Sequence, residues 1–134
     1  MDYKLSKKEK LRSRTSVDRL FDEGKSLMAF PLRAVYRLRQ PGDAPAQFLI
    51  TIPKKRIRKA VMRVTLRRRT REAYRLNRRQ LLLEPLADLG CGVDMAFIYL
   101  DNMPAPYSVI SEKVTNLLSR ITAAAIEQQS HTHE

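Results

Sequence analysis

A run of closely spaced Lys and Arg residues carries the most distinctive chemistry in this chain. From Lys54 to Arg79 the sequence holds 13 basic residues and a single acid, Glu72, whereas all 134 residues together hold 26 basic and 14 acidic residues. The rest of the chain is therefore neutral, and the entire net charge of +12 belongs to this segment. Charge concentrated in this way indicates a surface for a polyanion, and the most common polyanion is nucleic acid.

Most of the basic segment is predicted to be a helix with two different faces. Residues 60–83 contain no Gly or Pro and are rich in good helix formers. At about 100° per residue, an apolar stripe forms on one side and a row of arginines on the other. The stripe comprises Met62, Leu66, Thr70, Ala73 and Leu81, and the row comprises Arg63, Arg67, Arg71, Arg75 and Arg78. Like charges at i and i+4 repel, whereas solvated surface helices alternate their charges, so the row indicates a bound polyanion.

Several aromatic residues have two possible roles. They are Phe21, Phe30, Tyr36 and Phe48, and they fall on the predicted first helix and first two strands. Such residues could be ordinary core residues, or they could line a sheet face on which unpaired bases stack. Arg33 and Arg37 would alternate with them along the first strand. The residues alone leave both roles open.

Residues suited to catalysis or metal binding are sparse. The single cysteine, Cys91, excludes an internal disulfide and a Cys-rich zinc site. Both histidines lie in the polar tail 127–134, where we expect a solvated segment without a metal role. The sequence has no Gly-rich phosphate loop and no Cys/His arrangement. We therefore expect no catalytic residue and no cofactor bound by this chain alone, so that a partner would carry out any reaction.

The elements that must position these residues alternate between helix and strand periodicity. We expect one domain over residues 1–134, with a basic arm at 1–14 and a tail at 127–134 that are flexible. A short helix is expected to have Thr15 or Ser16 as its N-cap and to stop at Gly24. Strands are predicted at 28–38 and 47–52, and we expect these two to pair as an antiparallel hairpin. The helix at 60–83 follows, with Pro85 just past its end. A strand at 93–100 and a helix from Ser108 or Ser111 to Ile126 complete the chain. This order predicts an α+β fold, a two-layer sandwich of helices on one sheet.

The basic segment resembles the signature helix of the bacterial ribonuclease P protein subunit. The shared features are Lys54-Lys55 after a strand, then Arg58-Lys59-Ala60, Arg67-Arg68 and Arg71-Glu72-Ala73-Tyr74-Arg75. Asp18-Arg19-Leu20-Phe21 with Gly24, Val35-Tyr36 and Asp94-Met95-Ala96-Phe97-Ile98 also stand where that family places them. One departure is Arg63-Val64-Thr65, where the family has Arg-Asn-Arg, so contacts of that Asn and second Arg are not carried over.

The resemblance implies a fold and a function. The fold would be ribosomal-protein-S5-domain-2-like, with about four strands, three helices and a left-handed βαβ crossover. The residue pattern shows three strands, so the fourth would be short or would lie near residues 86–89. The chain would bind the catalytic RNA and the 5′ leader of precursor tRNA and promote 5′ maturation of tRNA. Catalysis and Mg²⁺ would belong to the RNA subunit, and no protein partner would be required.

Two groups of residues would make these contacts. The RNA-binding group is Lys54, Lys55, Arg58, Lys59, Arg63, Arg67, Arg68, Arg71 and Arg75. The leader-binding group would line a cleft between the first helix and the sheet and comprises Phe21, Arg33, Tyr36, Arg37 and Phe48.

Two alternative functions remain open from the residues. One is a ribosome-associated or general RNA- or DNA-binding module without an enzymatic partner. The other, binding to an acidic membrane, requires a broad apolar face, whereas Met62, Leu66 and Ala73 form a core stripe. With no apolar run long enough to span a bilayer and no secretory signal, we expect a cytoplasmic protein.

Overall fold

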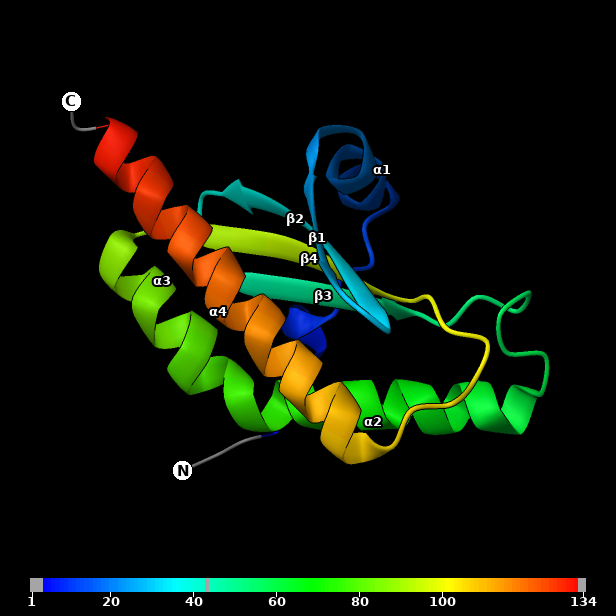
Figure 1. The fold of residues 1–134 in the computed structure, drawn as a ribbon. Coiled ribbons are helices and arrows are strands. Elements are labelled where there is room, and N and C mark those ends of the chain that lie inside the picture. Colours follow the sequence, from blue (N-terminus) through cyan, green and yellow to red (C-terminus); the bar gives the residue numbers. More distant parts are fainter. Residues whose placement is uncertain (1–3, 43, 133–134) are drawn as a thin grey trace.

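The computed structural model describes residues 4–42 and 44–132, which fold into two layers. The elements in chain order are η1 (Lys7–Glu9), α1 (Arg14–Glu23), β1 (Lys25–Ala29), β2 (Leu32–Arg39), β3 (Ala46–Thr51), α2 (Ala60–Arg78), η2 (Arg79–Leu83), α3 (Glu84–Leu89), β4 (Gly92–Tyr99) and α4 (Tyr107–Thr132). Helices α2, α3 and α4 lie on one side of the four-stranded sheet, and α1 lies on the other (Figure 1). This architecture confirms the predicted α+β class, while the hand of the crossover stays a prediction.

The order of the strands corrects the predicted hairpin. The sheet runs β1-β2-β4-β3, so β4 lies between the two strands that we expected to pair with each other. Strand β4 is antiparallel to β2 and parallel to β3. The physical reason is burial, because nearly every residue of β4 is buried and a strand covered on both faces occupies the centre of a sheet. The connection from β3 to β4 is consequently a crossover through α2 and α3.

The region predicted as the first strand contains parts of two strands, β1 and β2, which brings the number of strands to four. Residues 28–38 were expected to form one strand, but the chain reverses at Phe30-Pro31, so that β1 and β2 pair as antiparallel neighbours. Residues 86–89, where the resemblance suggested a strand, are helical and belong to α3. Residues 27–32 are all apolar, so apolar–polar alternation is absent at the reversal and gave no sign of it.

The N-cap of helix α1 lies two or three residues earlier than predicted, and the helix ends where expected. Ser13 is its N-cap, with a side-chain oxygen that accepts a hydrogen bond from the backbone N–H of Ser16. Gly24 ends the helix close to β2, and a Cβ added there would lie 2.9 Å from the Val35 side chain and 2.3 Å from the Leu20 carbonyl oxygen. Glycine at this position therefore lets the end of α1 approach the sheet.

The basic helix does not end at residue 83. It continues through a π turn, η2, into α3, and Pro85 lies in the first turn of α3 instead of past the end. Proline has no N–H to donate to the carbonyl four residues earlier, which is that of Leu81. The Thr122 hydroxyl of α4 donates to this carbonyl at 2.7 Å. A side chain from a neighbouring helix thus replaces the hydrogen bond that Pro85 cannot make.

The main core lies between the sheet and the helix layer. An apolar stripe of α4, formed by Val114, Leu117, Leu118, Ile121 and Ala125, is buried there. A smaller cluster beneath α1 contains Leu20, Val35 and Ala96. Helix α4 extends beyond the expected Ile126 to Thr132, while residues 1–3 and 133–134 of the predicted arm and tail lie outside the described part. None of the described helices combines the length and apolarity that crossing a bilayer requires.

Candidate nucleic-acid interface

The loop before α2 is held in shape by its own backbone and by Arg63. The Pro53 carbonyl accepts hydrogen bonds from the N–H groups of Arg56 and Ile57, and the Ile57 side chain is buried in the core. Arg63 reaches back from the first turn of α2, and its Nη1 donates to the carbonyls of Ile57 at 2.9 Å and Arg58 at 2.8 Å. These contacts leave Lys54, Lys55, Arg58 and Lys59 exposed.

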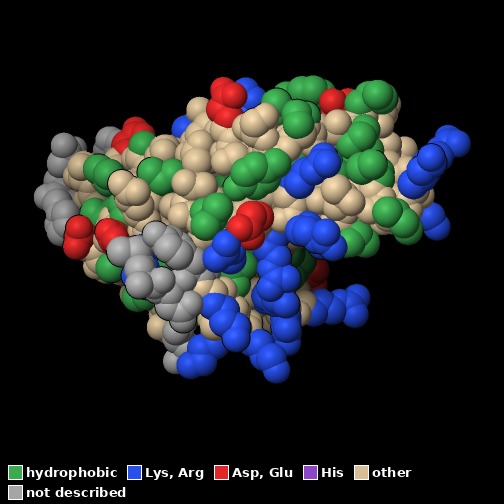
Figure 2. Space-filling view, turned by 90° about the horizontal axis from the view of Figure 1, so that it is seen from below, with side chains coloured by type: hydrophobic (Ala, Val, Ile, Leu, Met, Phe, Trp, Pro, Cys, Tyr) green, Lys and Arg blue, Asp and Glu red, His purple; other side chains and the backbone are tan. Residues whose placement is uncertain are grey.

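Helix α2 has a buried and a cationic face, as its sequence predicts, except that Arg78 of the predicted cationic row is buried. Leu66, Thr70 and Ala73 are fully buried, and Met62 packs against the same core. Arg67, Arg68 and Arg71 are exposed on the outer side. Lys and Arg side chains gather on the face of the molecule that α2 forms, with few acidic side chains among them (Figure 2).

Seven of the nine predicted RNA-binding residues form what we call the cationic surface. Its members are Lys54, Lys55, Arg58, Lys59, Arg67, Arg68 and Arg71, and none of them forms an ion pair with a residue in the described part of the chain. A hollow of about 550 Å³ beside the start of α2 is lined by Lys55, Arg56, Arg58 and Lys59. Arg56 was not predicted individually, although the unbroken run of basic residues is a signal for it.

The other two predicted residues, Arg63 and Arg75, are half-buried and have partners. Arg63 supports the loop, as described above. Arg75 donates two hydrogen bonds to the Glu72 carboxylate, from Nη2 at 2.6 Å and from Nε at 3.0 Å. The hydrogen bond from Arg75 holds the pKa of Glu72 below its usual value. The one acid of the basic segment therefore engages Arg75 in an ion pair.

The family departure on α2 changes the surface of its first turns. Val64 is half exposed, and the Thr65 hydroxyl donates to the Val61 carbonyl of its own helix. Arg69 points elsewhere, since its Nη1 donates to the Ala105 carbonyl in the loop between β4 and α4. Arg69 thus holds this loop and lies apart from the cationic surface.

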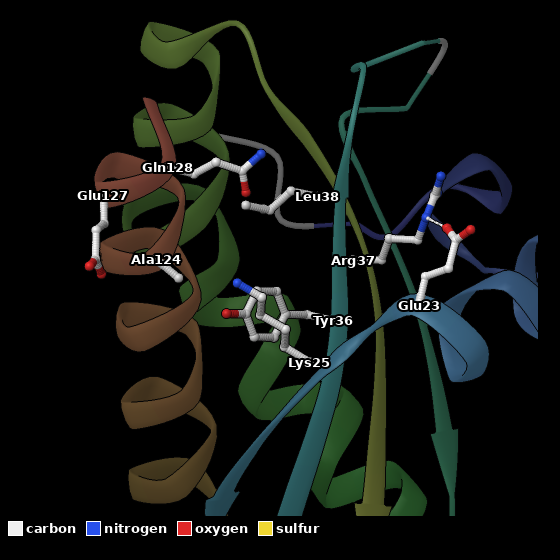
Figure 3. Close-up of a pocket in the computed structure, with 8 residues that line it drawn as sticks. All are labelled: Glu23, Lys25, Tyr36, Arg37, Leu38, Ala124, Glu127 and Gln128. Carbon is white, nitrogen blue, oxygen red and sulfur yellow. Dashed lines mark hydrogen bonds and ion pairs between the residues drawn. The ribbon is translucent and has the colours of Figure 1, made fainter. Parts of the chain in front are cut away.

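The structure does not assemble the predicted leader-binding cleft. Tyr36 and Phe48 are buried on the sheet face that α2 and α4 cover, and the Phe48 ring packs against Tyr74 with centroids 4.3 Å apart. Tyr36 lines a hollow of about 730 Å³ next to α4, and burial raises the pKa of its hydroxyl. Figure 3 shows its ring directed toward α4, whereas Arg37 projects to the opposite side of β2. Both aromatic residues are therefore separated from α1 by the sheet.

Phe21, Arg33 and Arg37 lie on the α1 side of the sheet. Phe21 is exposed on α1, and strand alternation places the two arginines on the same face as Val35, which packs beneath α1. Arg37 forms an ion pair with Glu23, the last residue of α1, at 2.9 Å. Arg33 donates two hydrogen bonds to the Ser26 hydroxyl of β1. Three of the five predicted residues thus share one face.

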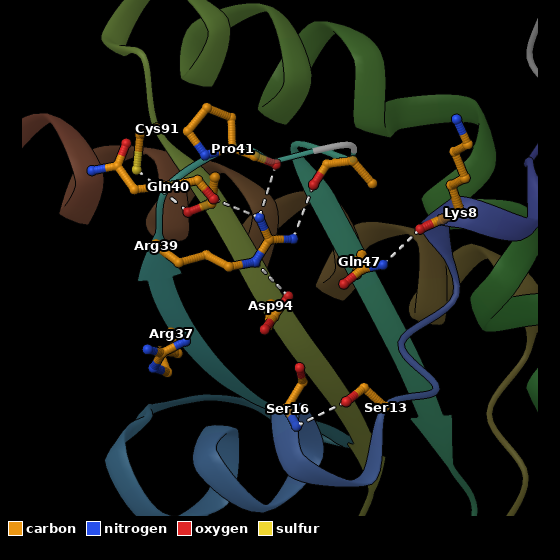
Figure 4. Close-up of polar contacts among 12 residues, drawn as sticks. Lys8, Ser13, Ser16, Arg37, Arg39, Gln40, Pro41, Gln47, Cys91 and Asp94 are labelled. Carbon is orange, nitrogen blue, oxygen red and sulfur yellow. Dashed lines mark hydrogen bonds and ion pairs between the residues drawn. The ribbon is translucent and has the colours of Figure 1, made fainter.

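A further arginine of β2 was not predicted to have a role. Arg39 donates from Nε to the Asp94 carboxylate at 2.8 Å and from its other nitrogens to the carbonyls of Gln40, Pro41 and Ala44 (Figure 4). Asp94 is almost completely buried. The two residues are 55 positions apart, and only the pairing of β2 with β4 brings them together. This arginine holds the turn between β2 and β3.

Within residues 4–42 and 44–132, no group of three or more His, Cys, Asp or Glu side chains could hold a metal ion. The arrangement offers cations to a polyanion, and it assembles no combination of nucleophile and base on the cationic surface.

Comparisons with known proteins identify the family. Residues 5–122 match the family model described as Ribonuclease P. The chain is 36% identical over 118 residues to the ribonuclease P protein component of Porphyromonas gingivalis strain ATCC 33277, covering 87% of this chain and 85% of that protein. It is 34% identical over 102 residues to the ribonuclease P protein component of Chlorobaculum tepidum, covering 71% of this chain and 66% of that protein.

Solved structures of similar fold lead to the same family. The ribonuclease P protein of Thermotoga maritima superposes with a TM-score of 0.65 at 27% identity, over 84% of this chain and 96% of that one. The protein from Staphylococcus aureus gives a TM-score of 0.65 over 84% and 94% of the two chains, and at 15% identity it supports the fold alone. The family match over most of the chain, together with the relatives above 30% identity, shows that this chain belongs to the ribonuclease P protein family, whose members are components of an endoribonuclease that processes the 5′ end of tRNA.

Proposed function

We propose that this chain binds ribonuclease P RNA and precursor tRNA through the cationic surface. The observation that carries the proposal is the set of seven exposed cations without an ion pair among the described residues. In the isolated protein these charges repel one another, and phosphate groups would relieve that repulsion while releasing counterions from the RNA. Arg supplies the fork that suits bidentate phosphate contacts.

We assign the chemistry of cleavage to the RNA subunit. That subunit would hold Mg²⁺ and activate the attacking water. The protein would screen phosphates where the catalytic RNA and its substrate approach each other, so that less Mg²⁺ is needed for the two RNAs to associate.

We place the 5′ leader on the α1 face of the sheet. Phe21 offers an exposed ring for stacking, and Arg33 and Arg37 lie on the same side of β2. Tyr36 and Phe48 are left out of this assignment because both are nearly fully buried on the other face. Contacts to the leader would give precursor tRNA a higher affinity than mature tRNA.

Reconstitution with a bacterial ribonuclease P RNA at low Mg²⁺ tests the main proposal. The chain is expected to stimulate cleavage of precursor tRNA, and the variant Arg67→Glu/Arg68→Glu is expected to lose most of that stimulation while its circular dichroism spectrum is unchanged. Lys25→Glu/Lys113→Glu, which reverses two cations outside the cationic surface, is the matched control. No stimulation by the wild-type chain would refute the proposal, and equal affinity for duplex DNA and ribonuclease P RNA would favour a general nucleic-acid-binding module.

A second measurement tests where the leader binds. Phe21→Ala is expected to lower the affinity for precursor tRNA by about 5–150-fold, the range for loss of one stacked base, and to leave the affinity for mature tRNA unchanged. Phe30→Ala removes another exposed ring, at the turn between β1 and β2, and serves as the control. An equal loss for precursor and mature tRNA would contradict the assignment.

A further inference from the structure

The basic segment at the N-terminus follows a fixed path along the edge of the sheet from Lys8 onward. Lys10 forms a parallel bridge to Phe48 of β3, and the Leu11 N–H donates to the Phe48 carbonyl at 2.9 Å. The Gln47 side chain donates to the Lys8 carbonyl at 2.8 Å, as Figure 4 shows. Leu11 is buried in the cluster beneath α1. These contacts attach the segment to β3 on one side and to the smaller core on the other.

A buried ion pair attaches the same segment to α2. Arg78 Nε donates to Glu9 Oε1 at 2.6 Å, and the two side chains are only 7% and 14% exposed. The other nitrogens of Arg78 donate to the Arg75 and Lys4 carbonyls. Glu9 also accepts a hydrogen bond from the Ser6 N–H, which closes the single turn η1. A buried guanidinium needs its carboxylate partner, so this contact fixes η1 beside the C-terminal half of α2.

The pair has an electrostatic consequence for its neighbours. The negative charge of Glu9 is neutralised by Arg78 and withdrawn from solvent. The adjacent Lys7 and Lys8 are exposed, so their charges face water without being offset by Glu9. Arg71 lies seven residues before Arg78, two turns away on the same side of α2. Because Glu9 pairs with Arg78, η1 is held about two helical turns along α2 from Arg71, near the end of the row of cations.

We propose that Lys7 and Lys8 bind the phosphodiester backbone of RNA together with the cationic surface, and that Glu9 is the positioning residue that holds them there through Arg78. The proposal rests on the proposed RNA binding and extends it to a second element of the chain. RNA fits this surface because its phosphates are evenly spaced along a strand, so one strand can contact α2 and η1 in succession.

The surface is tested by the salt dependence of binding. The probe is a ribonuclease P RNA transcript without substrate, titrated with the chain at several KCl concentrations. Lys7→Gln/Lys8→Gln is expected to reduce the slope of log K against log salt by about 1.4–1.8, the loss of two phosphate contacts. The control Lys25→Gln/Lys113→Gln is expected to keep the wild-type slope. A wild-type slope in the Lys7/Lys8 variant would overturn this inference, whereas absence of binding by the wild-type chain would refute the proposed function itself.

The positioning role of Glu9 is tested by the slope of log K against log salt, because a loss of stability alone does not change this slope. Glu9→Gln keeps both lysines and the shape of the side chain, yet it is expected to lower the slope nearly as much as removing the lysines. A merely structural effect would lower the fraction of folded protein, measured by circular dichroism, and leave the slope unchanged. Glu9→Asp, which keeps the charge, is expected to restore part of the slope.

A second variant covers the case in which Glu9→Gln does not fold. Arg78→Lys keeps the positive charge opposite Glu9 but loses the planar fork that makes the contact. It is expected to loosen η1 and lower the slope as well. A folded Glu9 or Arg78 variant with the wild-type slope would overturn the positioning role.

Discussion

The arginines of α2 and those of β2 differ in whether they have partners within the protein. On the outer side of α2, Arg67, Arg68 and Arg71 are exposed, and no ion pair engages them among the described residues. On β2, Arg33 and Arg37 each have a side-chain partner, and Arg39 has both Asp94 and three backbone carbonyls. The difference teaches that the density of basic residues does not by itself mark a binding surface. What matters is whether the fold also supplies acceptors within reach.

The largest expected effect lies in the β2 region. Asp94→Asn removes the charged partner of Arg39 and leaves a poorly solvated guanidinium, so the free energy of unfolding is expected to fall by about 3–5 kcal/mol. Urea denaturation measures the loss. The salt dependence of RNA binding by the folded protein should stay at the wild-type value, and a loss of stability below about 1 kcal/mol would remove the contrast between the regions.

A substitution on α2 is expected to have the opposite pattern of effects, on RNA binding instead of stability. Arg67→Gln/Arg68→Gln is expected to reduce the slope of log K against log salt by about 1.4–1.8, because two phosphate contacts disappear. Its free energy of unfolding is expected to stay within about 0.5 kcal/mol of wild type, since both residues are exposed. The two quantities come from KCl titration and urea denaturation. A large loss of stability would show that these arginines serve the fold.

The inner side of α2 gives a third, pH-dependent expectation. The hydroxyl of Tyr74 is buried and has no hydrogen-bond partner in the described part of the chain, and burial raises its pKa well above the usual 10.0. Tyr74→Phe is therefore expected to stabilise the protein by about 1 kcal/mol. Above pH 10 the unfolded tyrosine ionises first, so wild-type stability falls as pH rises, and the variant should lose less. Urea denaturation at neutral and alkaline pH checks both statements, and equal alkaline losses would contradict the second.

Arg37 combines both properties, because it has an ion-pair partner and is also a proposed contact of the 5′ leader. Its ion pair with Glu23 is partly open to solvent, so Arg37→Gln is expected to cost only about 0.2–1 kcal/mol of stability. If the leader lies on the α1 face, the variant should bind precursor tRNA less tightly and mature tRNA as before. Filter binding with the two RNAs measures this. Unchanged affinity for both would assign Arg37 to the fold, with Arg39.

The smallest effect concerns the one ion pair within α2. Glu72→Gln releases Arg75 from its carboxylate, so the slope of log K against log salt is expected to rise by about 0.7–0.9, one additional phosphate contact. The same KCl titration detects it. An unchanged slope would mean that Arg75 lies outside the path of the RNA.

The local features of the fold were predictable from the sequence. The helix at 60–83 and the buried stripe of α4 follow from periodicity, which depends on neighbours along the chain. The strand order does not, because the pairing of β4 with both β2 and β3 joins distant residues. The reversal at Phe30-Pro31 was missed because it lies in the uniformly apolar stretch 27–32, where periodicity gives no signal, and only the pairing of β1 with β2 reveals it.

The candidate site was predictable to the same extent. The exposed cations of α2 and its preceding loop follow from composition and helical geometry. The roles of Tyr36 and Phe48 do not, since alternation says that a strand has two faces without saying which one α1 covers. The partners of Arg39 and Arg78 could not be predicted from the sequence either, because Asp94 and Glu9 are 55 and 69 positions away from them.

The π turn at η2 marks the end of the basic side of the helix. A π turn accommodates one residue more than an α-helical turn, so everything after it is rotated by about 100° relative to an uninterrupted helix. Beyond the turn, the exposed residues of α3 include Glu84 and Asp88 in place of arginines. At the π turn, therefore, the exposed side of the helix rotates and its exposed charges change from positive to negative.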